Sequence, residues 1–440
     1  MGAMGAQFSQ AAGSLLIQAL SARLLGTSDF AAVALLLSNI VLATGISTGL
    51  IGDSLTVLDR HDPVIRTALR RLMVVVVLGS AVVGAASSSV THLVGTEDSV
   101  LFGFLLALWM AEDVLRRLLM ASLRFWAIVA VDLTHLVISS GFVLSCGVLT
   151  GHSPSLRVFV IALSLGQIGA SVVALVVLPA KERYWGRAQA GGVRTVLDFG
   201  VSRSVQAALR PAVLQTLRVI VVVVAGRTAY ASLEAARLYV APALLAVNGI
   251  GSFLLSTFAV RTGALRRSAL WRADGAASML MAASALLTGA MVVLARINPR
   301  LVSGNVPVST AAVAAWGIYT ACVAVSMPYG SLAAVRGRQF PVLMIRIADS
   351  VSSIAFLCAG LLPALVAIDQ APTLVAAGSL VGTFLLRPLA ARSVIVPPRH
   401  RSPDSWRLGG SRFAVPTRRT WVSTERGDTP SSRRLTGTHG

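Results

Sequence analysis

The stretch "RFWAIVAVDLTHLVISS" (residues 124–140) decides the class of fold. It is apolar from Phe125 to Val131, then carries Asp132 and His135 before the apolar run resumes. With the residues that follow, it is long enough to cross a hydrocarbon core, which takes about 20 apolar residues. A carboxylate inside such a span is costly unless it faces protein or a water-filled cavity. The stretch therefore predicts a transmembrane helix with a polar group turned toward the protein interior.

The whole chain has the composition of an integral membrane protein. Of its 440 residues, 55% are hydrophobic and only 13% are charged, whereas soluble domains carry about 25% charged residues. The net charge of +20 does not indicate nucleic-acid binding, because the arginines cluster between apolar runs and in a polar tail. That placement is typical of loops that face an anionic cytoplasmic leaflet. The three cysteines lie inside apolar runs, at spacings that fit neither a metal site nor a disulfide framework.

Apolar segments of a length suited to the bilayer recur along the chain. The first begins in an N-terminus without the basic region of a signal peptide, so we expect it to remain as a helix. Arginines are more frequent in every second loop, which predicts that both termini are cytoplasmic. The twelve predicted spans are 5–25, 30–52, 72–94, 100–121, 125–149, 157–180, 201–225, 228–258, 276–296, 308–330, 341–365 and 371–391.

An internal repeat relates the two halves of the chain at an offset of 200 residues. "LGTSDFAAVALL" begins at Leu25 and "AGRTAYASLEAA" at Ala225; Gly26 and Gly226 match, and an aromatic residue follows each glycine. We expect both glycines to lie in tight outer turns. Each half holds six predicted spans, so the halves share one orientation and leave a cleft between them, as in transporters that work by alternating access.

The repeat and the composition together predict three regions. Residues 1–192 form a first six-helix bundle and residues 193–392 a second. Residues 393–440 are rich in Pro, Gly, Ser, Thr and Arg without apolar periodicity, so we expect a disordered cytoplasmic tail. Its arginines predict attraction to anionic membrane lipids, and the alternative is a solvated tail without a specific role.

A cationic stripe runs along the predicted helix 201–225. On a helical wheel, Arg203, Gln206, Arg210 and Arg218 fall within an arc of roughly 120°. Arginine binds phosphate through two parallel hydrogen bonds, so the stripe predicts a binding site for an anionic group such as a pyrophosphate. The alternative is that Arg203 extends to the membrane interface and that the other arginines pair with carboxylates.

Asp132 and Asp349 lie at similar depths in the two halves, and Arg346 precedes Asp349 by one turn. We expect their charges to be offset by Arg346 and by the stripe, which makes them counter-charges. The alternative is that they carry a coupling proton or bind sodium. His135 follows Asp132 by one turn and is interpreted as a hydrogen-bonded helix residue or, alternatively, a proton relay.

Other charged residues are predicted to form pairs within one helix. Glu112 precedes Arg116 by four residues, and Asp113 precedes Arg117 by the same spacing. Glu234 and Arg237 are interpreted in the same way. The sequence contains no glycine-rich phosphate loop, catalytic triad or metal-ligand pattern. We therefore expect neither an enzyme nor a resident cofactor or metal.

Three stretches resemble a known family. "LLIQALSARLLGTSDFAAVALLLSNIV" (15–41) is similar to the opening helices of bacterial polysaccharide-export flippases, and "DVLRRLLMASLRFWAIVAVDLTH" (113–135) to their fourth and fifth helices. "SRSVQAALRPAVLQTLRVIVVVVAG" (202–226) resembles the helix that opens their second half. These are Wzx-like oligosaccharide-lipid flippases of the multidrug/oligosaccharidyl-lipid/polysaccharide flippase superfamily. The chain departs from them in its long tail and in a first helix without a basic lead.

The resemblance implies an all-α, MATE-like membrane protein with about twelve helices in two six-helix repeats around a central cationic cleft. It implies that the chain moves polyprenyl-pyrophosphate-linked oligosaccharide across the bacterial inner membrane. Arg210 and Arg218 would then meet the pyrophosphate, while Asp132 and Asp349 would be counter-charges or coupling sites for a proton or sodium. Proteins of polysaccharide assembly would be its partners.

Two other classes remain open. One is an ion-coupled exporter of drugs or other small molecules, of the MATE or major facilitator type. The major facilitator pattern is only partly present, because Asp59 and Arg60 lack the surrounding glycines. The other is a membrane scaffold that transports nothing, which the arginine stripe disfavours because intramembrane charges are costly unless they are used.

Overall fold

A computed structural model describes residues 2–90, 94–183, 191–260, 266–335, 339–363 and 365–395. These residues form helices joined by short loops and contain no strand. They belong to one compact unit, Met1–Pro397. The predicted tail lies almost entirely outside the described residues, so its predicted disorder stays a prediction.

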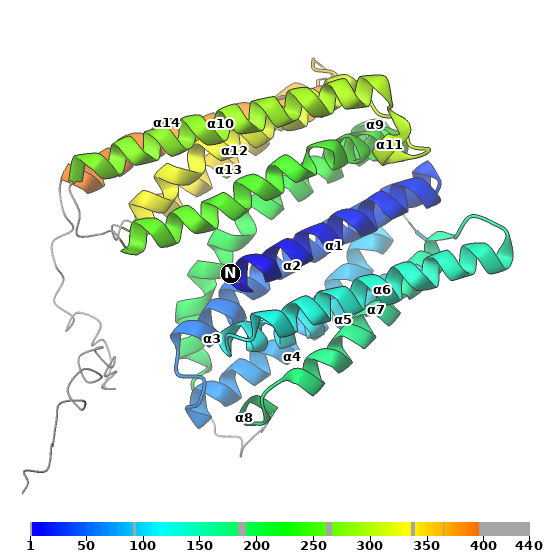
Figure 1. Cartoon of the computed structure of the whole chain (residues 1–440), viewed down its shortest axis with the longest axis horizontal. Helices are drawn as coiled ribbons and strands as arrows, with labels where there is room; N and C mark the ends of the chain where they lie inside the picture. The colour runs from blue at the N-terminus through cyan, green and yellow to red at the C-terminus, as the bar shows by residue number, and fades with distance from the viewer. Residues whose placement is uncertain are drawn as a thin grey trace, which may run out of the picture. The chain divides into compact units, whose positions relative to one another are not determined.

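The first half contains six long helices and two short ones (Figure 1). A π-helical turn, η1, continues α2 into α3, whereas the other long helices are separated by loops. The bounds are α1 Gly2–Leu24, α2 Thr27–Ser47, η1 Thr48–Gly52, α3 Asp53–Val57, α4 Pro63–Val90, α5 Thr96–Ala121, α6 Phe125–Thr150, α7 Leu156–Val177 and α8 Ala180–Arg183.

The second half begins with α9, which consists of two helices joined at Gly226. The backbone there has φ 82° and ψ 175°, a conformation that glycine adopts without the steric cost of a Cβ atom. The predicted turn at Gly226 is therefore confirmed, while Gly26 lies between α1 and α2 with an ordinary φ of −66°. The bounds are α9 Val193–Val260, α10 Arg266–Ile297, α11 Arg300–Ser303, α12 Thr310–Val335, α13 Gln339–Leu361, η2 Ile368–Gln370 and α14 Ala371–Ile395.

The described helices account for the predicted number of spans. Nine of them are long and apolar enough to cross a membrane. That number leaves out α1 and α5, which are long but more polar, and it counts the two helices of α9 once. With these three added, the described part of the chain has twelve long helices. The prediction of an all-α membrane protein with about twelve helices is confirmed.

The halves meet chiefly where α2 and η1 pack along α9. Glycines allow the backbones to approach closely at one end of this contact: a Cβ atom on Gly49 would overlap the backbone nitrogen of Ser204. A Cβ atom on Gly45 would lie 3.1 Å from the carbonyl oxygen of Ala207, which is a tight contact and not an overlap. Further along, the repeat-related Phe30 and Tyr230 are 1% and 0% exposed and belong to one shared core. The division at residue 193 between two bundles stays a prediction.

Candidate functional site

Arg210 lies near the middle of the first helix of α9 and faces α12. Its Nε donates a hydrogen bond to the hydroxyl of Tyr319 at 3.0 Å, and its guanidinium carbon lies 5.5 Å from the centre of that ring. Both contacts stabilise the cation. The Nη2 atom is buried and has no hydrogen-bond partner. A buried donor without a partner costs free energy. A hydrogen bond from this atom to an anionic ligand would remove that cost.

Arg346 and Asp349 lie on α13, which packs against α9. Their closest atoms, Nη1 and Oδ2, are 4.0 Å apart, which is a loose ion pair, and the charge of Arg210 acts on both residues. A Cβ atom on Gly382 of α14 would lie 2.6 Å from Asp349 Oδ1, an atom that is buried without a well-formed hydrogen bond. We call Arg210, Tyr319, Arg346 and Asp349 the cationic cluster; it carries two positive charges and one negative charge.

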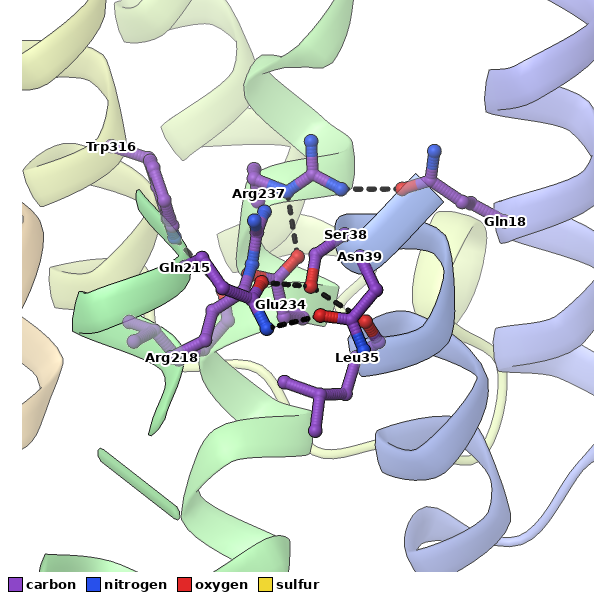
Figure 2. A network of polar contacts seen from close by, with 10 residues as sticks. Gln18, Leu35, Ser38, Asn39, Gln215, Arg218, Glu234, Arg237 and Trp316 are labelled. Carbon is purple, nitrogen blue, oxygen red and sulfur yellow. Dashed lines mark hydrogen bonds and ion pairs between the residues drawn. The ribbon is translucent and has the colours of Figure 1, made fainter. Parts of the chain in front are cut away.

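Arg218, in contrast, is held in a buried ion pair. Its Nε lies 2.8 Å from Oε1 of Glu234, and the two side chains are 6% and 1% exposed. The other carboxylate oxygen of Glu234 lies 2.7 Å from Nε of Arg237, which confirms the predicted pair within that helix. Arg237 also donates to Gln18 of α1 (Figure 2). For Arg218 the structure therefore supports pairing with a carboxylate and not contact with a ligand.

The same network contains residues that the sequence did not single out. Gln215 of α9 donates to Asn39 of α2 at 2.8 Å and contacts the hydroxyl of Ser38 (Figure 2). These amides join the two halves through polar contacts between α2 and α9. In the sequence, these residues could have been found as polar side chains inside apolar segments, because a polar side chain in the membrane needs a hydrogen-bond partner.

Arg203 and Gln206 lie near the start of α9, where Gly45 and Gly49 allow the backbones of the two halves to approach closely. Arg203 Nε is 2.7 Å from Oδ2 of Asp53 in the other half, with 39% of the arginine side chain exposed, and Arg203 also donates to Gln206 at 3.4 Å. Arg203 thus forms an ion pair between the halves, which neither predicted role included. The predicted stripe is divided into three environments, and only Arg210 joins Arg346.

The expected partners of Asp132 were wrong. Its carboxylate lies 3.3 Å from Nε of Arg116 and accepts a hydrogen bond of 2.6 Å from Ser9, so its neighbours come from α5 and α1. Arg116 was predicted to pair with Glu112; its guanidinium instead contacts Asp132 of α6 and donates to the carbonyl oxygen of Ala6, while its charge still acts on Glu112. The orientation of α5 relative to α6 decides which carboxylate the Arg116 guanidinium contacts.

His135, interpreted as a hydrogen-bonded helix residue or a proton relay, packs against an aromatic ring. The rings of His135 and Trp109 meet edge to face with their centres 5.3 Å apart. Both ring nitrogens are buried without a well-formed hydrogen bond, and the backbone of Gly166 lies close by. The predicted pair of Asp113 and Arg117 is confirmed at 2.7 Å.

Among the described residues, no group of three or more His, Cys, Asp or Glu side chains is arranged to hold a metal ion. In the first half, Asp132 is paired with Arg116 and Asp113 with Arg117, whereas the cationic cluster retains a buried donor without a partner, Nη2 of Arg210. The cluster is therefore the candidate site for an anionic ligand.

No family model and no curated protein matches the chain. Solved structures do. An inward-facing multidrug resistance MATE family transporter of the MOP superfamily matches with a TM-score of 0.65 and 14% identity, covering 88% of this chain and 94% of that one. A MATE protein in the straight conformation matches with a TM-score of 0.56 and 14% identity, covering 89% and 94%.

A MOP superfamily transporter from Pyrococcus furiosus, for which reverse polarity of the binding pocket is described as suggesting a different function, matches with a TM-score of 0.60. It is 15% identical, and the match covers 88% of this chain and 92% of that one. At this level of identity the likeness shows a shared fold and not a shared function. The chain has the fold of MATE family transporters of the MOP superfamily.

Proposed function

We propose that the protein is a flippase that moves polyprenyl-pyrophosphate-linked oligosaccharide, or a related polysaccharide precursor, across the bacterial plasma membrane by alternating access. The observation that carries this proposal is the cationic cluster. The second half of the protein holds Arg210 and Arg346 near each other, with one carboxylate, Asp349, in a loose ion pair with Arg346 and a buried donor without a partner on Arg210.

A pyrophosphate satisfies this arrangement better than a cation does. Its oxygens accept hydrogen bonds from guanidinium groups in a planar, bidentate geometry. A cationic drug entering the same place would meet two positive charges against one negative charge, and like charges at short range cost free energy. The net charge of the cluster therefore supports an anionic substrate.

The second candidate is an ion-coupled exporter of drugs or other small molecules. The fold is equally consistent with it, since one of the similar structures is a multidrug resistance transporter. The exporter would use Asp349 as its cation site and Arg346 as a counter-charge. A scaffold without transport activity is disfavoured by the unused donor in the cluster.

For coupling we propose Asp349 and not Asp132. Asp349 is 16% exposed, and its Oδ1 atom has no well-formed hydrogen bond. Asp132 is bound on one side by Arg116 and on the other by Ser9, so its charge is already compensated. A proton or sodium ion bound at Asp349 would change the attraction of the cluster for a pyrophosphate, which is the requirement for coupling.

The test uses purified protein in liposomes that contain a fluorescent polyprenyl-pyrophosphate sugar. We expect wild type to bind and flip it, and Arg210→Ala and Arg346→Ala to bind it about tenfold more weakly or worse, since hydrogen bonds to charged groups contribute about 1.5–3 kcal/mol. Arg296→Ala is the matched control, because Arg296 is exposed at the end of α10.

Thermal melting of each variant separates loss of binding from loss of folding. Wild-type protein that ignores the lipid-linked sugar but exports a cationic dye under an ion gradient would overturn the flippase proposal in favour of the exporter. Equal binding by wild type and both cluster variants would remove the cluster as the anion site.

We also propose that both termini are cytoplasmic, that the tail (393–440) binds anionic lipids, and that proteins of polysaccharide assembly receive the product. The placement of arginines in alternate loops supports the orientation. Labelling of single cysteines at either end of the chain in intact cells tests it.

A further inference from the structure

A groove with a volume of about 560 Å³ lies between α4 and α5, away from the cationic cluster. This volume is within the range of small-molecule sites, about 300–1,000 Å³. Its walls are apolar along most of their length, and its charged residues are gathered at one end. The lining residues are Leu55, Arg60, His61, Pro63, Arg66, Thr67, Leu69, Arg70, Met73, Val74, Val77, Leu78, Ala111, Val114, Leu115, Leu118 and Glu182.

The polarity of the groove follows from one face of α4. Arg66, Arg70, Val74 and Leu78 are spaced four residues apart, so they lie one above another on the same side of the helix. Two arginines therefore lead directly into an apolar stripe. Val74 and Leu78 are 51% and 61% exposed, which is the exposure of side chains that face lipid in a membrane-spanning helix.

The mouth of the groove is positively charged. Its lining residues among those the structure describes include Arg60, Arg66 and Arg70 and one acid, Glu182, which is bound to Arg60 at 3.0 Å. Arg66 donates to the carbonyl oxygen of Lys181 at 2.9 Å, so its charge is oriented at the mouth without being neutralised there.

The other two acids of the neighbouring loop do not line the groove. Asp59 accepts a hydrogen bond from the backbone nitrogen of His61, and Asp62 accepts one from that of Val64. The described lining residues therefore carry a net positive charge, which favours an anion.

The length of the apolar stripe identifies the kind of molecule. Eight residues separate Arg70 from Leu78, and at 1.5 Å per residue this gives about 12 Å. One leaflet of a bilayer has about half of the 30 Å hydrocarbon thickness, or about 15 Å. The groove thus matches an acyl chain that stays within one leaflet, with its headgroup at the arginines.

We propose that this groove binds an anionic glycerophospholipid of the leaflet that borders the α3–α4 loop, with one acyl chain between α4 and α5 and the phosphate at Arg66 and Arg70. A lipid seated there holds α4, α5 and α8 together at the end of the first half. The site is independent of the flippase proposal, because it shares no residue with the cationic cluster.

The test measures lipids retained by the purified full-length protein after extraction from bilayers of equimolar dioleoyl-phosphatidylglycerol and dioleoyl-phosphatidylcholine, by native mass spectrometry. We expect wild type to retain phosphatidylglycerol selectively. Arg70→Gln should weaken that retention about fivefold, the effect of one basic residue at an anionic surface. Val74→Trp should also reduce it, because the indole occupies the apolar part while the mouth stays intact.

Arg71→Gln is the matched control: Arg71 is the next residue on α4, is exposed and does not line the groove. Selective retention that Arg70→Gln and Val74→Trp weaken and Arg71→Gln leaves unchanged would support the site. Equal loss in Arg70→Gln and Arg71→Gln would mean general attraction to the leaflet and would overturn it. So would equal retention of phosphatidylcholine, or displacement of phosphatidylglycerol by undecaprenyl phosphate added at the same concentration. Melting temperatures confirm that each variant is folded.

Discussion

Replacing Glu234 by glutamine should be among the most destabilising single changes in the described part of the protein. The carboxylate is 1% exposed and binds two guanidinium groups, those of Arg218 at 2.8 Å and Arg237 at 2.7 Å (Figure 2). Glutamine has nearly the same shape but no charge, so the variant leaves Arg218 buried without a counter-charge. Breaking a buried ion pair from one side costs about 3–5 kcal/mol.

That cost converts into a measurable shift in melting temperature. An unfolding entropy of about 2.1 cal/mol/K per residue, applied to the unit Met1–Pro397, amounts to roughly 0.8 kcal/mol/K. A loss of about 4 kcal/mol therefore lowers the melting temperature by about 5 °C, and by more if a smaller part of the chain unfolds cooperatively. Melting is followed by differential scanning fluorimetry in detergent, with wild type in the same micelle.

Two further variants separate the ion pair from a general effect of mutation. Arg218→Met should cost less than Glu234→Gln, because Glu234 keeps Arg237 as a partner. The double variant should be more stable than Glu234→Gln alone, since removing both partners leaves no unpaired charge at Arg218. An unchanged melting temperature in Glu234→Gln, or a double variant less stable than either single one, would refute the reasoning.

The other predictions concern the contact between the halves and the two intramembrane aspartates. Gly49→Ala places a methyl group against a backbone nitrogen of α9, so the helices must separate, and we expect the free energy of unfolding to fall by about 1–3 kcal/mol. Gly79→Ala is the control in the same melting assay, because a Cβ atom there meets nothing within 4 Å. Asp132→Asn should lower the melting temperature because it leaves Arg116, 7% exposed, without its carboxylate, while transport per folded molecule keeps its response to ion gradients. Asp349→Asn should do the reverse, with stability nearly unchanged and the gradient response lost; a gradient response lost only in Asp132→Asn would contradict this assignment.

Particular residues show which contacts the sequence predicts and which it does not. Asp113 and Arg117 lie four residues apart on one helix, so their pairing follows from helical geometry alone and was predicted correctly. Arg116 has the same spacing from Glu112, yet it turns to Asp132 because α6 lies on that side of α5. Arg218 was a candidate ligand residue by its place on the wheel, and the bend at Gly226 returns Glu234 to it. Spacing within one helix fixes a short-range pair only where no neighbouring helix offers a better partner.

Composition and apolar periodicity, which are local properties of the chain, determined that this is an all-α membrane protein, how many helices it has and where a glycine turn divides the second half. Only the tertiary structure decided which charges are neutralised and which remain available to a ligand. The reason is that a charge in the membrane takes the partner nearest to it in space, and that distance depends on how helices rotate and pack. The arginine stripe is one feature in the sequence, but packing places its arginines in three environments. Arg203 forms an ion pair between the halves, Arg218 forms a buried ion pair, and Arg210 keeps a buried donor without a partner.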